Sequence, residues 1–123
     1  MAEIEDADIN VSLNYQQGDI VWVPFPFTDL SRTKVRPALI ISNHMVNKTG
    51  DYLLMMITHV NKGDSLSLEL NEGDFDGPPL PYKSYLRLHK IFILNRSLIE
   101  RKVTASHQGA IEHVVFSITR LLR

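Results

Sequence analysis

The apolar residues between positions 18 and 94 fall into short runs that Pro, Gly and Asn separate. A run of four to eight residues rich in Val, Ile and aromatic residues is typical of a β-strand and too short for an ordinary helix. Residues 20–23 form such a run before Pro24, and residues 36–41 form another, with Pro37 near its start. The remaining runs cover residues 52–60, 65–70 and 85–89. The runs therefore predict a β-rich chain of short strands.

Two of these runs alternate strictly between apolar and polar residues. Residues 65–70 read Ser-Leu-Ser-Leu-Glu-Leu, and residues 85–89 read Tyr-Leu-Arg-Leu-His. Successive side chains of a strand point to opposite faces, so the second run predicts Arg87 and His89 together on one face. Such a pair joins a fixed cation to a group that titrates near neutrality, although a solvated polar face has the same pattern.

Turn-forming residues predict how the runs are connected. Asn and Gly residues punctuate positions 43–50, and the glycines and prolines of residues 71–81 predict a loop. Residues 91–94 either continue the preceding strand or bend away from it.

The end of the chain changes to a helical period. Ser106 is a plausible N-cap for this helix, and Arg120 suits its C-terminal end. Five or six short strands followed by one helix predict a mainly β (α+β) domain, in which a small, strongly curved barrel or sheet carries the helix. Apolar residues spaced for one helical face are Ile111, Val114, Val115, Ile118, Leu121 and Leu122.

The composition limits the chemistry and the partners. With 123 residues, 44% hydrophobic, the chain is expected to fold as one domain, and the absence of cysteine excludes disulfides and zinc–thiolate sites. The net charge is -1, but residues 1–14 hold four of the 14 acids and no base, which leaves 13 bases against 10 acids in the rest. A mildly basic body is compatible with RNA, and equally with an ordinary mixed surface.

The first residues differ in character from the rest. Residues 1–15 are acidic and polar without periodicity, which predicts a loosely ordered extension ahead of a domain over residues 16–123. The N-terminus has the wrong charge for a signal peptide, and no apolar run approaches the roughly 20 residues that span a bilayer. We therefore expect a cytoplasmic protein without membrane contact.

Several kinds of site are absent from the sequence. The six glycines do not cluster into a phosphate-binding loop, and there is no Gly-x-Ser-x-Gly motif. None of the five histidines has the spacing of a helical zinc motif; His107 and His113, six residues apart, are expected on different faces of the last helix. We expect neither a metal site nor a cofactor.

A cluster of cations lies immediately before the second strand. Arg32, Lys34 and Arg36 fall within five residues. The fixed fork of donors in a guanidinium matches a phosphate, so the cluster could hold a phosphodiester, while a solvated loop is the alternative interpretation. Thr58 and His59 end the third apolar run, where a threonine more commonly serves the backbone than catalysis.

Four blocks of the sequence resemble the MazF/PemK family of bacterial toxins, and its PemK-like branch most closely. The first block, residues 18–29, begins Gly-Asp-Ile-Val-Trp-Val-Pro-Phe, and the second, residues 34–42, contains Arg-Pro-Ala-Leu. Residues 56–58 supply a third-strand threonine, and residues 83–91 follow a proline-rich loop, as in the family. The resemblance extends over residues 16 to 122.

The resemblance implies a small SH3-like curved barrel of five to seven strands with a C-terminal helix. It implies the toxin of a type II toxin–antitoxin system, a homodimer that cleaves single-stranded mRNA at specific sequences without a metal ion. The disordered C-terminal segment of a cognate antitoxin is then expected to occupy the RNA groove.

The resemblance also assigns roles to residues. Arg36 matches the catalytic arginine, Thr58 its partner in the active site, and Arg87 a position that binds or cleaves RNA in some members. These roles suit RNA, whose 2′-OH supplies the nucleophile, because a guanidinium can stabilise the charged phosphorane. Unstacked bases can be bound by aromatic rings and nearby cations. The RNA-binding candidates are Phe25, Phe27, Arg32, Lys34, Tyr85 and Arg87.

Two departures from the family pattern leave alternatives open. His89 stands where the family usually has an aspartate; it could act as general acid or base, or mark altered specificity or weakened activity. The loop of residues 30–35 lacks the Gly-Ser-Glu-Gln type of sequence, so Ser31 is only a candidate for the loop serine. One alternative is a catalytically silent homologue that binds RNA or an antitoxin. The other is a CcdB-like gyrase poison on the same fold, although this chain lacks that class's C-terminal Trp-Gly-Ile.

Overall fold

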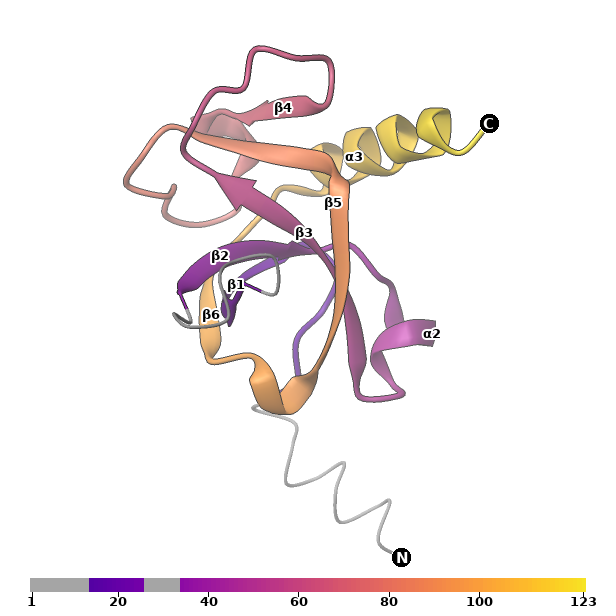
Figure 1. The fold of residues 1–123 in the computed structure, drawn as a ribbon. Helices are drawn as coiled ribbons and strands as arrows, with labels where there is room; N and C mark the ends of the chain where they lie inside the picture. Colours follow the sequence, from indigo (N-terminus) through magenta and orange to yellow (C-terminus); the bar gives the residue numbers. More distant parts are fainter. Residues whose placement is uncertain (1–13, 26–33) are drawn as a thin grey trace, which may run out of the picture.

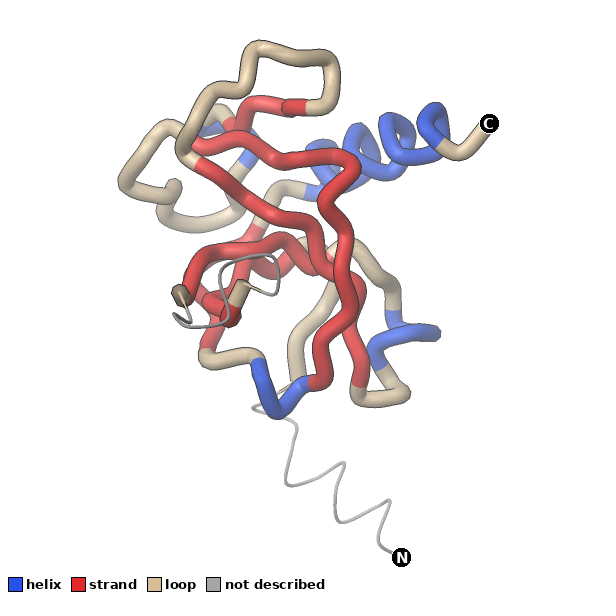
Figure 2. The backbone as a smooth tube through the Cα atoms, viewed as in Figure 1, coloured by secondary structure: helices blue, strands red, loops and turns tan. Residues whose placement is uncertain are grey.

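The computed structural model describes residues 14–25 and 34–123, whose strands form one antiparallel sheet (Figures 1 and 2). Neighbouring strands follow the order β4-β5-β3-β2-β1-β6. The six strands of these residues are β1 (Asp19–Pro24), β2 (Val35–Ile40), β3 (Asp51–Thr58), β4 (Ser67–Leu70), β5 (Ser84–Asn95) and β6 (Arg101–Ala105). The helical elements are α2 (His44–Asn47), the 3-10 helices η2 (Glu72–Asp74) and η3 (Arg96–Leu98), and the C-terminal α3 (Gln108–Leu121).

The sheet curls because β5 bends in its middle. The pairing of β5 with β3 jumps from Leu86 opposite Ile57 to Ile91 opposite Met55, so residues 87–90 stand against Met56. Extra residues on one strand bend it and increase its twist. Figure 1 shows the resulting corner, where β5 leaves β4 and turns to run along the rest of β3.

The two edges of the curled sheet approach each other beyond β4 and β6. Phe75, which follows η2, forms a β-bridge with Ser106, which follows β6. The Ser106 N–H in turn donates to the Gly18 carbonyl oxygen at 2.7 Å. The result is a curled half-barrel with one C-terminal helix, which confirms the predicted mainly β fold.

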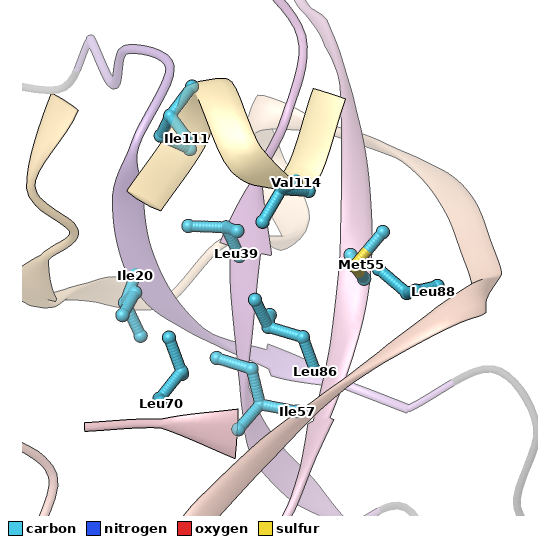
Figure 3. Packing of buried hydrophobic residues seen from close by; sticks show 9 residues of the cluster. All are labelled: Ile20, Leu39, Met55, Ile57, Leu70, Leu86, Leu88, Ile111 and Val114. Carbon is cyan, nitrogen blue, oxygen red and sulfur yellow. The ribbon is translucent and has the colours of Figure 1, made fainter. Parts of the chain in front are cut away.

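Both faces of the central strands are buried, which explains their continuous apolar sequences. In β2, Leu39 packs on the face beneath α3, whereas Ala38 and Ile40 pack on the opposite face. Figure 3 shows the cluster under α3: Ile20, Leu39, Met55, Ile57, Leu70, Leu86, Leu88, Ile111 and Val114. The opposite face holds a second cluster: Val21, Val23, Ala38, Ile40, Tyr52, Leu54, Phe92 and Ile99.

The predicted strands are confirmed, and two features of the sheet go beyond the predictions. Residues 91–94 continue β5 rather than leaving it. The strand β6 was not predicted, because its sequence Arg-Lys-Val-Thr-Ala opens with two exposed charges and buries little. It forms through pairing with β1, a partner more than 70 positions away in the chain.

The structure corrects several local predictions. Positions 43–50, expected as a plain connection, contain the single turn α2, and the expected loop 71–81 contains η2. The N-cap of α3 is His107, whose Nδ1 accepts from the Gly109 N–H at 3.1 Å, and not Ser106. Ser106 forms the β-bridge with Phe75, and it lies one residue before the N-cap position of the helix.

The predicted apolar face of α3 is used only in part. Ile111 and Val114 are buried against the sheet, whereas Val115, Leu121 and Leu122 are exposed. The C-terminal turns extend beyond the strands, as Figure 1 shows, so no sheet lies under them. Within residues 14–25 and 34–123, no helix has the length and apolar character that crossing a membrane requires.

Most of the predicted acidic extension, residues 1–13, lies outside the described residues. Its last residue, Tyr15, is anchored on the domain. The Tyr15 N–H donates to the Tyr52 hydroxyl oxygen at 3.2 Å, and the two rings meet edge to face with centroids 6.0 Å apart. Contacts with the domain thus begin before the first strand.

Two adjacent valines of α3 provide a matched test of this packing. Val114 is 1% exposed and Val115 is 44% exposed. We expect Val114→Ala to lower the free energy of unfolding by about 2 kcal/mol, because it removes two buried carbons and leaves a cavity. Val115→Ala is expected to change it by less than about 0.5 kcal/mol. Chemical denaturation measures both, and equal losses would contradict the described orientation of α3.

Candidate functional site

Arg36 and Thr58 lie in one row across four strands. In β1, Val23 stands opposite Arg36. In β5, Tyr85 stands opposite Thr58. The pairing of β2 with β3 ends at Ala38 opposite Met56, and Arg36 and Thr58 each lie two residues beyond this pair, at the same end of the two strands. Residues directly opposite in an antiparallel pair share a face. The structure therefore places the two residues that the sequence predicted as catalytic at the same end of neighbouring strands.

The guanidinium of Arg36 is oriented by an aromatic ring. Its Cζ lies over the Phe25 ring, 5.5 Å from the ring centroid, and Phe25 in turn meets Phe92 edge to face with centroids 6.2 Å apart. Such a cation–π contact is electrostatically favourable and leaves the N–H groups at the guanidinium edge open. Among residues 14–25 and 34–123, no carboxylate forms an ion pair with Arg36. Arg36 can therefore donate to an anionic ligand.

Phe25 itself is only 4% exposed. Its ring is covered by Arg36 and Phe92, so it supports the guanidinium and does not offer a free face to a base in this conformation. Tyr85, the other described ring predicted to stack on RNA, is likewise buried. Lys34 is exposed just before β2. The remaining predicted positions in this region, Phe27, Ser31 and Arg32, lie outside the described residues.

The Thr58 hydroxyl closes the turn that follows β3. Its Oγ1 accepts from the Val60 N–H at 3.1 Å, and the side chain is partly exposed. A hydroxyl has one proton to donate besides the lone pairs that accept. Thr58 can therefore hold the turn and still donate to a ligand that Arg36 binds.

Arg87 occupies a different environment from the one the alternation predicted. It is 7% exposed, and its Nη1 and Nη2 donate to the Asp64 carboxylate at 2.8 and 3.2 Å. Nη1 also donates to Ser67 Oγ at 2.6 Å. The hydrogen bonds from Arg87 lower the pKa of Asp64 below its ordinary value. The guanidinium predicted to bind RNA is thus already paired within the protein.

His89 does not join the row of Arg36 and Thr58. It is exposed, within residues 87–90 where β5 breaks its register with β3, whereas the strand neighbour of Thr58 is Tyr85. Arg87 and His89, which were predicted to share a face, differ in their burial: Arg87 is buried and His89 is exposed. A period of two holds only while the strand stays regular.

The sequence did not predict the aromatic pair that lies beside Thr58. The rings of His59 and Tyr82 lie with centroids 6.1 Å apart at an interplanar angle of 43°. Tyr82 is 72% exposed, so this ring, unlike that of Phe25, is open to a ligand. The signal was weak, because Tyr82 sits among prolines and only the fold brings it to the end of β3.

A hollow beside the helix does not include Arg36 in its lining. It encloses about 410 Å³, and its lining includes Glu69, Asp74, His107 and His113. The sequence placed the two histidines on different faces of the last helix, but His107 precedes the helix as its N-cap and both line this hollow. Within the described ranges, no three side chains of the metal-binding types gather in a potential site.

A comparison with family models identifies one family. The family model for the PemK-like, MazF-like toxins of type II toxin–antitoxin systems matches residues 16–122. No sequence among the curated proteins matches the chain. Similar solved structures include MazF in a MazE–MazF complex from Deinococcus radiodurans, 22% identical with a TM-score of 0.71, covering 89% of this chain and 96% of that one.

Two mycobacterial structures are similar as well. An endoribonuclease in complex with its cognate antitoxin, from a mycobacterial species, is 16% identical with a TM-score of 0.69 and covers 88% of this chain and 94% of that one. The Mycobacterium tuberculosis toxin MazF-mt6 is 14% identical with a TM-score of 0.66, covering 85% and 95%. At these identities the structures establish a shared fold.

The ion pair of Asp64 and Arg87 is expected to make the folded protein less stable as the pH falls. The pKa of Asp64 is lowered in the folded state, so the pair stabilises the fold above the unfolded-state pKa of about 3.9, and this contribution is lost as the pH falls through the lower folded-state value. We expect Asp64→Asn to melt below the wild type at pH 7, with a gap that narrows below about pH 4.

Asp76→Asn is the control for this comparison, because Asp76 is an exposed carboxylate outside the ion pairs of the described ranges. Thermal unfolding of the three proteins between pH 7 and pH 3 provides the measurement. A gap that stays constant with pH, or one that Asp76→Asn reproduces, would show that Arg87 does not stabilise the Asp64 carboxylate.

Proposed function

This chain belongs to the PemK-like, MazF-like toxins of type II toxin–antitoxin systems, and on that premise we propose that it is a sequence-specific endoribonuclease. Its substrate is single-stranded RNA, mRNA in the cytoplasm, and its reaction requires no metal ion. The observation that carries the proposal is the row that holds Arg36 and Thr58, where the Arg36 guanidinium has no carboxylate partner among the described residues. The proposal places the toxin domain at residues 16–123.

The reaction starts from the nucleophile that RNA itself carries. The 2′-oxygen attacks the adjacent phosphorus and loses its proton, the bond from phosphorus to the 5′-oxygen breaks, and that oxygen leaves as a hydroxyl after gaining a proton. The products are a 2′,3′-cyclic phosphate, or a 3′-phosphate after hydrolysis, and a 5′-hydroxyl. The protein's task is to orient the phosphate and to stabilise the negative charge that develops on its non-bridging oxygens.

Arg36 suits this task because its position is set in advance. The Phe25 ring beneath the guanidinium and the pairing of Arg36 with Val23 in β1 hold it without using the N–H groups at its edge. Donors already in place need not reorganise as the charge develops, which is the source of their effect on rate. Thr58 adds one hydroxyl donor on the same face, and Lys34, exposed next to this row, adds positive charge that attracts the RNA backbone.

His89 has no assigned part in the transition state of this scheme. It is exposed at the bend of β5, outside the row that holds Arg36 and Thr58. An imidazole there suits contacts with nucleotides farther along the RNA. A His89→Asn variant whose rate of cleavage loses its dependence on pH near neutrality would instead favour a role in proton transfer.

The proposal includes the partners that the family implies. We propose a homodimer whose RNA surface is covered by the C-terminal segment of a cognate antitoxin. Similar folds solved with their antitoxins, from Deinococcus radiodurans and a mycobacterial species, support this partner class. An acidic segment would complement Arg36 and Lys34, the same cations that we propose for the phosphates of RNA.

Replacing Arg36 tests the assigned chemistry directly. We expect Arg36→Ala to lower the cleavage rate of a long single-stranded RNA in EDTA on the order of 10²- to 10³-fold, as loss of a charge-stabilising donor does. Primer extension maps the cut sites, and end labelling identifies the 5′-hydroxyl.

Arg101→Ala is the matched control for this substitution. Arg101 also lies over a ring, with its Cζ 6.0 Å from the centroid of Trp22, and Trp22 is on the face of β1 opposite to that of Val23. Cleavage by folded Arg36→Ala at the wild-type rate would remove Arg36 from the mechanism. RNA binding without cleavage by the wild type would favour a catalytically silent homologue.

The Thr58 hydroxyl is tested by two replacements of similar size. We expect Thr58→Ser to keep most of the activity, whereas Thr58→Val loses about tenfold in the single-turnover rate because it deletes one hydrogen bond. The Val60 N–H that Thr58 binds is exposed, so water can replace the lost acceptor and little stability should be lost. Equal rates for the two variants would mean that the hydroxyl does not contact the reacting phosphate.

A further inference from the structure

Arg87 is a buried cation that the proposed chemistry does not use. Its guanidinium presents both terminal nitrogens to Asp64, at 2.8 and 3.2 Å, and reaches Ser67 Oγ at 2.6 Å. Ser67 lies opposite Arg87 in the pairing of β4 with β5, so this contact lies within the sheet. The contact with Asp64 instead extends out of the sheet, to the loop between β3 and β4.

That loop, residues 59–66, is tied to β5 at one end by these contacts. Asp64 Oδ1 accepts from the Leu66 N–H at 3.1 Å, which closes a turn around the carboxylate that Arg87 holds. The Leu66 carbonyl oxygen accepts from the Leu88 N–H at 2.9 Å. Side-chain and backbone bonds therefore fix residues 64–66 against β5, next to Arg87.

The other end of the loop begins at the proposed active site. Thr58 Oγ1 caps the turn at Val60, and the ring of His59 packs beside the open ring of Tyr82. The loop is short, so its anchor at Asp64 restricts where this first turn can lie. The environment of Thr58 therefore depends on a contact several residues farther along the chain.

We propose that Arg87 is a positioning residue, which holds Asp64 and thereby sets loop 59–66 and the Thr58–His59 turn, and that it does not bind the substrate phosphate. The proposal rests on the proposed RNA cleavage for its functional consequence. A phosphate that approached Arg87 would meet a side chain only 7% exposed and a bidentate carboxylate whose charge repels the incoming anion. Arg36, which has no such partner among the described residues, is free for the phosphate.

The two possible roles of Arg87 predict opposite effects of Asp64→Asn. If Arg87 bound phosphate, Asp64 would compete with RNA, and Asp64→Asn would bind RNA more tightly and still cleave it. If Arg87 positions the loop, Asp64→Asn removes the anchor and resembles Arg87→Ala. Asp76→Asn removes the same charge from the surface and corrects for the general effect of charge on RNA affinity.

The experiment measures the loop and the activity separately, in the full chain. We expect Asp64→Asn and Arg87→Ala each to speed amide hydrogen exchange in residues 59–66 and to lower kcat/KM on single-stranded RNA by about 10- to 100-fold. The double variant should lose no more than the worse single variant, because both remove one contact. Arg87→Lys should fail to rescue, since an ammonium cannot make the bidentate contact, whereas a phosphate ligand would retain part of its function.

Several outcomes would overturn the proposal. In one such outcome, Asp64→Asn binds RNA more tightly than Asp76→Asn and cleaves it at the wild-type rate, whereas Arg87→Ala does not cleave it. Another is unchanged exchange in residues 59–66 in both single variants. If the wild type cleaves no RNA, the proposed function fails, but hydrogen exchange still decides whether Arg87 anchors the loop. If Arg87→Ala does not fold, the exposed substitution Asp64→Asn carries the test.

Discussion

The pairing of β3 with β5, interrupted opposite Met56, controls the shape of the whole domain. A regular ladder would leave a gently twisted sheet, whereas four residues of β5 placed against one residue of β3 force a corner. The corner lets one long strand pair with β4 on one side and continue along β3 on the other. It also decides which side chains of β5 are buried, so the candidate site depends on it.

Arg36 and Arg87 differ because of what surrounds them. Arg36 lies over an apolar ring with no carboxylate partner in the described ranges, so its donors stay available. Arg87 is buried and held in a bidentate contact by Asp64. The same residue type therefore serves as a candidate ligand for phosphate in one place and as an internal anchor in the other. Charge and alternation alone could not separate these roles.

Much of the fold was predictable from local patterns. The β-branched runs of β1, β2 and β3 are buried on both faces, and their sequences are accordingly apolar without interruption. The strand β6 was missed because it is charged and exposed and exists through pairing with β1. The cap of α3 was assigned one residue early because the bridge that engages Ser106 joins segments distant in the sequence.

By itself, the sequence determined the strand runs, the C-terminal helix, the family resemblance and the choice of Arg36 and Thr58, since these depend on local periodicity and on short motifs. Only the tertiary structure decided that Arg36 lies over a buried phenylalanine at the same end of the sheet as Thr58, that Asp64 holds Arg87, and that His89 is exposed in the register break of β5. The physical reason is that register, bends and ion pairs arise between residues far apart in the chain. A sequence period of two shows which residues alternate between the two faces of a strand. A bend within the strand decides which of these residues are buried.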